Sequence, residues 1–219
     1  MIDFAEATFG EAFAVGLTGG IGAGKSAVAQ VWAERDAGVV EGDEMGRLAL
    51  EHDADLRKRL AERFGAEILT SGDKIDRRKL AAVAFADLSA QRDLTRLTFP
   101  ALYSLARKSL MDLTRNHQVV VFDAALIFEW GVEQDFDLIV AVDAPRERMV
   151  RNAVERLGIT EQKALARLAM QISPEMKCRL AHEVIYNDGD LEQLRENARQ
   201  MWDRIAALAE EKRTQEAKG

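Results

Sequence analysis

Residues Gly16–Ser26 read GLTGGIGAGKS, and their spacing sets the architecture expected for the chain. The segment from Gly19 onward fits the pattern G-x-x-x-x-G-K-[ST], in which a glycine-rich turn joins a buried strand to the first turn of a helix. The apolar run Phe13–Thr18 precedes the turn, and Ser26–Asp36 continues with helical periodicity. The sequence therefore predicts a strand, a glycine-rich loop and a helix in immediate succession.

A loop of this composition is suited to holding phosphate. Glycines allow backbone conformations in which successive N–H groups point inward around an anion, and the helix N-terminus adds its partial positive charge. Lys25 can reach the β- and γ-phosphates of a nucleotide, and the Ser26 hydroxyl can ligate Mg²⁺. ATP with Mg²⁺ is the expected ligand. The residues expected to contact its phosphates are Gly20, Gly22, Ala23, Gly24, Lys25, Ser26 and Ala27.

Four further short apolar runs predict the rest of a sheet. They are Gly38–Glu41, Val119–Asp123, Asp137–Asp143 and Glu183–Tyr186. Most are rich in β-branched residues and lack alternation, which is typical of strands covered on both faces of a parallel sheet. Helical stretches lie between them, and Asp190 is a good N-cap for a final helix. The expected fold is α/β, a P-loop NTPase-type parallel five-stranded sheet with helices on both faces.

Two helical segments interrupt this core. Residues 45–116 contain no convincing strand and are expected to form a helical substrate-binding insertion, with a helical stretch over Glu44–Phe64. Residues 145–180 hold eight bases and four acids and are expected to form a helical lid, with Pro145 at the start of its first helix. The whole is expected to be one unit over 13–211, whose core comprises 13–44, 117–144 and 181–211.

Two carboxylates follow predicted strands and are candidates for handling an acceptor molecule. Asp43 ends the second strand and could accept the proton of an attacking hydroxyl. Asp123 ends the third strand and could hold a metal-bound water or orient the substrate. Either could instead be an ordinary helix cap or turn residue. In the basic lid, Arg151 and Arg156 are candidates for covering the nucleotide phosphates.

The composition of the 219 residues argues against several other classes of protein. Thirty Lys and Arg residues against thirty-seven Asp and Glu residues give a net charge of −7, a poor match for a dedicated nucleic-acid binder. No run approaches the roughly 20 apolar residues that a membrane-spanning helix needs. Cys178 is the only cysteine, so nothing points to an oxidising compartment. We expect a cytoplasmic monomer that binds neither nucleic acid nor a membrane.

Five blocks of the sequence, in order, resemble the dephospho-coenzyme A kinase family. The first is the glycine-rich segment Gly16–Ser26, and together the blocks lie between about Phe13 and Leu208. A glycine-rich loop alone is shared by many kinases, whereas five ordered blocks are much more selective. The other four are VVEGDEMGR at Val39–Arg47, GDKIDRRKLAAVAF at Gly72–Phe85, DAALIFE at Asp123–Glu129 and ALARLAMQISPEMKCRLAHEVIYNDG at Ala164–Gly189.

The resemblance implies ATP-dependent phosphorylation of the ribose 3′-hydroxyl of dephospho-coenzyme A, the last step of coenzyme A synthesis. It implies that Asp43 is the base or the group that orients the hydroxyl. Lys25 would stabilise the transferring charge, and Arg156 would close over the phosphates. Arg77 and its neighbours in the insertion would bind coenzyme A, together with Asp123, and Asn187 would lie beside the nucleotide base.

Two alternatives stay open, one because many kinases share the phosphate loop and the other because several residues depart from the family's pattern. Glu41 replaces the first acid of a D-A-D segment, Phe99 replaces a histidine before Pro100, and Ala125 replaces a proline. The first alternative is another small-molecule P-loop kinase, acting on a nucleoside or nucleotide. The second is a switch that binds ATP without transferring its phosphate.

Overall fold

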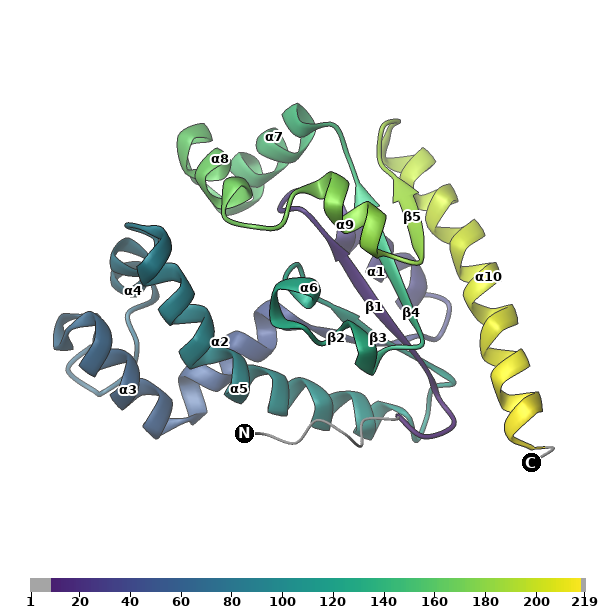
Figure 1. Ribbon diagram of the computed structural model, residues 1–219, viewed down its shortest axis with the longest axis horizontal. Coiled ribbons are helices and arrows are strands. Elements are labelled where there is room, and N and C mark those ends of the chain that lie inside the picture. The colour runs from purple at the N-terminus through teal and green to yellow at the C-terminus, as the bar shows by residue number, and fades with distance from the viewer. Residues whose placement is uncertain (1–8, 218–219) are drawn as a thin grey trace. The chain divides into compact units, whose positions relative to one another are not determined.

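The computed structural model describes residues 9–217 (Figure 1). The chain forms two compact units, one made of Met1–Val40 with Leu110–Gly219 and the other of Glu41–Ser109. Among the described residues, no helix combines the length and apolar character needed to cross a membrane.

The first unit is built on a five-stranded sheet with the strand order β2-β3-β1-β4-β5. The pairs β1–β3, β1–β4 and β4–β5 are all parallel. All seven residues of the central strand β1 are buried, because helices cover both faces of the sheet. The predicted fold class is confirmed. The strands are β1 (Phe13–Gly19), β2 (Gly38–Glu41), β3 (Val119–Asp123), β4 (Leu138–Asp143) and β5 (Glu183–Tyr186).

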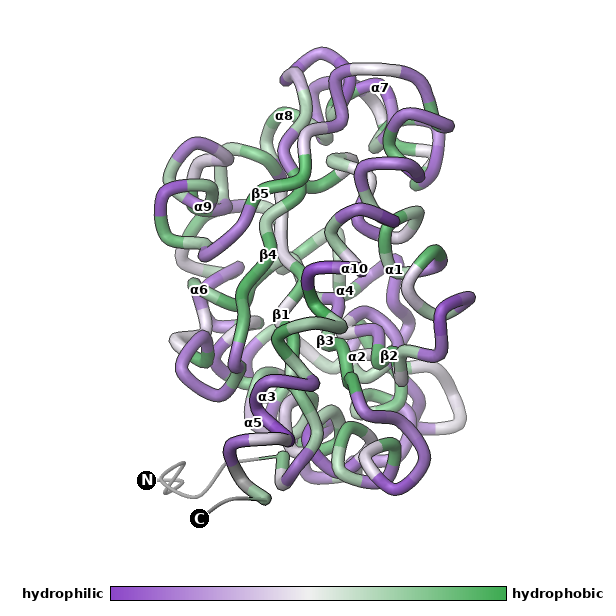
Figure 2. Tube along the Cα trace, turned by 90° about the vertical axis from the view of Figure 1, so that its right-hand side faces the viewer, coloured by the Kyte–Doolittle hydropathy of each residue, from purple (hydrophilic) through white to green (hydrophobic). Residues whose placement is uncertain are grey.

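Helices α1 (Lys25–Ala33) and α10 (Leu191–Glu216) pack against each other and against the sheet. Trp32 of α1 is fully buried and donates a hydrogen bond from Nε1 to the Ala198 carbonyl of α10, at 2.9 Å. Asp190 caps α10 as expected, since its side chain accepts from the Gln193 N–H. Figure 1 shows α9 (Pro174–Leu180) in front of β1 and β4, with α1 behind them. The tube of β4 is strongly hydrophobic in Figure 2, as a strand covered on both sides requires.

Between β3 and β5 the first unit carries further short helices. Helices α7 and α8 pack against each other within the segment expected to be the lid. Helix α7 begins at Arg146 rather than at Pro145, because Pro145 has an extended backbone conformation and occupies the N-cap. The elements are α6 (Ile127–Trp130), η2 (Glu133–Asp135), α7 (Arg146–Leu157) and α8 (Glu161–Ala169).

The second unit is helical, with its own core. Leu56, Leu60 and Ile68 are fully buried at its centre. The helical stretch predicted over Glu44–Phe64 is broken at Asp53, whose side chain accepts from the Leu56 N–H and starts a new helix. The predicted stretch is helical, but it consists of two helices. The elements are α2 (Gly42–His52), α3 (Ala54–Phe64), η1 (Ala66–Ile68), α4 (Arg77–Ala84) and α5 (Leu88–Leu113), of which the last turn of α5 lies in the first unit.

Candidate active site

The glycine-rich loop connects β1 to α1 and needs glycine for its backbone path. Gly22 and Gly24 have φ values of 77° and 110°, in the left-handed region that side chains disfavour. A Cβ on Gly22 would overlap the Met149 carbonyl oxygen of α7, and one on Gly24 would lie 2.7 Å from the Asn187 amide nitrogen. The loop is therefore packed closely against the segments that follow β4 and β5.

Replacing Gly22 with alanine is expected to weaken ATP binding by at least about tenfold, because a left-handed residue costs roughly 1–2 kcal/mol and the Met149 carbonyl must also shift. Calorimetric titration with Mg²⁺ and ATP measures the effect. Gly72→Ala is the matched control, because nothing lies within 4 Å of a Cβ at that position. Equal affinity for ATP in wild-type protein and Gly22→Ala would contradict the assignment of the loop.

Three amide side chains hold the loop from outside. Asn152 Nδ2 donates to the Gly22 carbonyl at 2.8 Å, and Asn187 Nδ2 donates to the Ala23 carbonyl at 2.8 Å. Gln171 Oε1 accepts from the Ile21 N–H at 3.2 Å. Within the loop the Ala23 N–H donates to the Gly20 carbonyl at 3.1 Å, so side chains from outside and one internal hydrogen bond together fix the backbone path of the loop.

One face of α7 is directed at the loop. Arg148, Asn152 and Arg156 recur every four residues and therefore lie on the same side of the helix. Arg156 Nη1 donates to the Ser26 hydroxyl at 2.8 Å, and Arg148 Nη1 donates to Asn187 Oδ1 at 3.0 Å. Of the two predicted lid arginines, only Arg156 lies on this face, because Arg151 is five positions before it in α7. The four-residue spacing was a sequence signal that could have identified Arg148 and Asn152.

The predicted residues of the first unit that come together are those of the loop, Arg156 and Asp123. Lys25 is the first residue of α1 and Ser26 the second, so both lie at the helix N-terminus. Asp123 ends β3 as predicted, pairs in register with Leu17 of β1, and is 9% exposed. It thus lies where the two strands approach the loop.

The other two predicted residues, Asp43 and Arg77, belong to the second unit. Asp43 does not end β2, which stops at Glu41, but lies exposed in the first turn of α2. Arg77 is the first residue of α4. A hydrogen bond from Arg47 lowers the pKa of Glu44, and the charge of Arg77 acts in the same direction. Asp43 and Arg77, the two residues assigned to the acceptor, therefore both lie within this helical unit.

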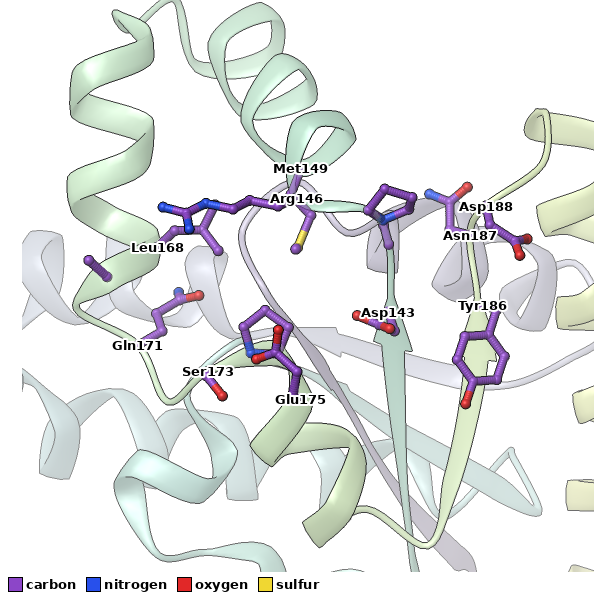
Figure 3. A pocket seen from close by; sticks show the side chains of 14 residues that line it. Asp143, Arg146, Met149, Leu168, Gln171, Ser173, Glu175, Tyr186, Asn187 and Asp188 are labelled. Carbon is purple, nitrogen blue, oxygen red and sulfur yellow. The ribbon is translucent and has the colours of Figure 1, made fainter.

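A cleft of about 630 Å³ lies where β4 and β5 end, and sequence analysis did not predict it (Figure 3). Burial raises the pKa of Asp143, the last residue of β4. Burial also raises the pKa of Cys178 on α9 to about 11, so this cysteine remains a thiol at neutral pH and is a poor nucleophile. Figure 3 shows Asp143, Arg146, Met149, Leu168, Gln171, Ser173, Glu175, Tyr186, Asn187 and Asp188 around the cleft.

Ser26 is the residue that fits Mg²⁺. Within residues 9–217 no three His, Cys, Asp or Glu side chains form a group that could hold a metal ion. Mg²⁺ usually keeps several waters and takes one or two protein oxygens together with substrate phosphates, so a dedicated cage is not required. A hydroxyl at the N-terminus of α1 meets that need, although Arg156 now donates to it and would have to turn toward the phosphates.

A glycine-rich loop after the central strand of a parallel sheet, with an arginine of a following helix hydrogen-bonded to it, defines a P-loop nucleotide-binding enzyme, the class to which the P-loop kinases belong. The profile of the dephospho-CoA kinase family matches residues 13–193. The dephospho-CoA kinase of Syntrophotalea carbinolica is 39% identical over 83% of this chain and 87% of its own. That of Corynebacterium diphtheriae is 35% identical over 90% and 98%. The chain therefore belongs to the dephospho-CoA kinase family.

Two solved structures have a similar fold. The structure of TT1252 from Thermus thermophilus is 32% identical and covers 91% of this chain and 97% of its own, with a TM-score of 0.73. The dephospho-CoA kinase from Campylobacter jejuni is 21% identical, covers 89% and 98%, and has a TM-score of 0.59. At that identity the second structure supports the fold alone.

Proposed function

We infer that this kinase transfers the γ-phosphoryl group of ATP to the ribose 3′-hydroxyl of dephospho-coenzyme A, giving coenzyme A and ADP. The observation that carries the inference is the Arg156–Ser26 hydrogen bond over the phosphate loop, in a chain that matches the family over residues 13–193. A helix that places an arginine side chain against the phosphate loop is the arrangement expected for covering a transferring phosphoryl group.

The proposed roles of the residues follow from their chemistry. The loop N–H groups and Lys25 stabilise the charge that spreads over the transferred group, and Arg156 completes the cover. Ser26 would hold Mg²⁺, which neutralises phosphate charge when it is bound. Asp43 would orient the acceptor hydroxyl or accept its proton, while Asp123 and Arg77 would contribute to acceptor binding. The loop that begins at Asn187 would border the base.

Three finer points belong to the same proposal. ATP and Mg²⁺ as co-reactants are supported by the kinase family and by the composition of the loop. A cytoplasmic location is supported only by membership of that family. Action as a monomer stays a prediction, and native mass spectrometry would measure it.

The test is ADP release from ATP and Mg²⁺ in the presence of single acceptors. We expect release to depend on dephospho-coenzyme A and to stay at the background rate with nucleosides and nucleoside monophosphates. Dependence on one of those other acceptors would keep the kinase class and overturn the substrate. If no acceptor raises ADP release above background while ATP still binds, the protein is better described as a switch that binds ATP without transferring its phosphate.

A further inference from the structure

Lys177 on α9 is fully buried, with its side chain 1% exposed. Its ammonium nitrogen lies 2.8 Å from Glu129 Oε1 and 3.1 Å from Glu129 Oε2 on α6. It also donates a hydrogen bond to the Ala125 carbonyl, in the turn between β3 and α6. All three donors of a lysine ammonium can be used in this way, so the cost of burying the charge is offset only while Glu129 is present.

The same carboxylate contacts the backbone of the basic lid segment between α8 and α9. Glu129 Oε1 accepts a hydrogen bond from the Ile172 N–H at 2.9 Å. The neighbouring residue is Gln171, whose side chain accepts from the Ile21 N–H of the phosphate loop. Lys177, Glu129 and the Ile172 N–H are therefore linked by hydrogen bonds, the chain itself joins Ile172 to Gln171, and a further hydrogen bond links Gln171 to the loop.

The charges around Lys177 show why Glu129 matters. Burial lowers the pKa of Lys177, the nearby charge of Lys25 acts in the same direction, and Glu129 opposes both. Lys25 is the cation assigned to the phosphates, so a second ammonium behind it is neutralised by its own carboxylate. Ile21 is not among the residues expected to contact phosphate, so Gln171 can hold the loop without occupying a phosphate-binding N–H.

We propose that the buried Lys177–Glu129 pair positions the phosphate loop for ATP by fixing Ile172 and Gln171 against it. Lys177 and Glu129 are positioning residues in this proposal, because they act through Gln171 and not by touching the nucleotide. The expected effect on the KM for dephospho-coenzyme A rests on the proposed function. The expected effect on ATP affinity does not, since that affinity is measured without an acceptor.

Loss of the Lys177–Glu129 pair is expected to lower the affinity for ATP and to leave acceptor binding unchanged. Ala125 keeps a second donor when Lys177 is removed, because the Thr18 hydroxyl also donates to its carbonyl at 3.3 Å. The Ile172 N–H, in contrast, has Glu129 as its acceptor. We expect Lys177→Met to weaken the binding of Mg²⁺ and ATP by about tenfold, the loss of one well-placed interaction. The KM for dephospho-coenzyme A should change by less than about twofold.

The matched control is Lys212→Met. Lys212 also forms an ion pair, with Asp137 at 3.0 Å, but Asp137 precedes β4 and so lies at the opposite end of that strand from the loop. This variant should keep the wild-type affinity for ATP. Comparable weakening in Lys212→Met would show that the loss of any lysine–carboxylate pair is sufficient, and would overturn the proposal.

A single substitution leaves one buried charge and can prevent folding. The double variant Glu129→Leu/Lys177→Met avoids this, because it removes both charges and fills the space with apolar side chains of similar size. It should fold, as circular dichroism would show, and should still bind ATP about tenfold less tightly because Ile172 has lost its acceptor. A folded double variant with wild-type ATP affinity would overturn the proposal.

A double-mutant cycle tests the route through Gln171. Gln171→Ala should weaken ATP binding in the wild-type background and add less than about twofold in the Lys177→Met background, because both substitutions break the same connection to the loop. Asn152→Ala, which frees the Gly22 carbonyl by another route, should be additive with Lys177→Met. Full additivity of Gln171→Ala with Lys177→Met would show that Lys177 does not act through Gln171, and would contradict the proposal.

Failure of dephospho-coenzyme A as a substrate would overturn the proposed function and leave these binding results intact.

Discussion

Replacement of Lys25 with alanine is expected to lower kcat/KM for ATP by about a hundredfold to a thousandfold, the usual effect of removing one preorganised donor to developing charge. Lys25 begins α1, so its ammonium and the helix N-terminus act on the same phosphates. Both the affinity for ATP and the rate of transfer should fall. Steady-state ADP release and calorimetric titration with Mg²⁺ and ATP separate the two effects.

The control for this substitution is Lys58→Ala. Lys58 is an exposed lysine of α3, so the variant loses the same charge and nearly the same volume without touching the loop. Its kinetics should match those of the wild-type protein. Unchanged ATP affinity in Lys25→Ala would remove the main support for assigning Gly19–Ser26 as the phosphate site, and with it the class of enzyme.

The strands were predictable because each is a short apolar run with little alternation. The predicted bounds of Gly38–Glu41, Val119–Asp123 and Glu183–Tyr186 agree with those of β2, β3 and β5. The loop was predictable from its glycines, whose left-handed backbone at Gly22 and Gly24 gives the motif its physical basis. Local sequence carries this information because strand burial and loop geometry depend on residues adjacent in the chain.

The contacts that surround the loop were not predictable in the same way. Gln171 lies far from the loop in sequence and reaches it through tertiary packing, and the Lys177–Glu129 pair joins two segments that are distant in the chain. The break at Asp53 was missed because one capping residue interrupts an otherwise continuous helical pattern. For Arg151, helical geometry decides the outcome, since a residue five positions before Arg156 lies on a different face of α7.

The departures from the family's pattern are only partly explained by the structure. Phe99, which replaces a histidine, stacks on Tyr103 one turn later in α5, with ring centroids 5.4 Å apart. Such a pair contributes to packing of the second unit. Ala125 keeps a backbone role, because its carbonyl accepts from both Lys177 and the Thr18 hydroxyl. Nothing in the structure explains Glu41.

Asp43→Asn is expected to lower kcat for dephospho-coenzyme A phosphorylation by about a hundredfold or more, the usual contribution of a positioned acid–base group. Asparagine keeps the shape of the side chain and can still accept one hydrogen bond, but it cannot take a proton. Because Asp43 is exposed in the first turn of α2, the substitution should change the stability of the fold by less than about 1 kcal/mol. Affinity for ATP should stay at the wild-type value.

Asp55→Asn provides the matched control, because Asp55 is also an exposed acid in the first turn of a helix, α3. Both variants lose the favourable interaction of an acid with a helix N-terminus, so that contribution cancels in the comparison. A kcat for Asp43→Asn equal to that of Asp55→Asn would show that Asp43 neither takes the proton nor orients the hydroxyl. A loss in kcat that saturating acceptor does not restore assigns Asp43 to the transfer step, because a defect in acceptor binding alone would raise KM and leave kcat unchanged.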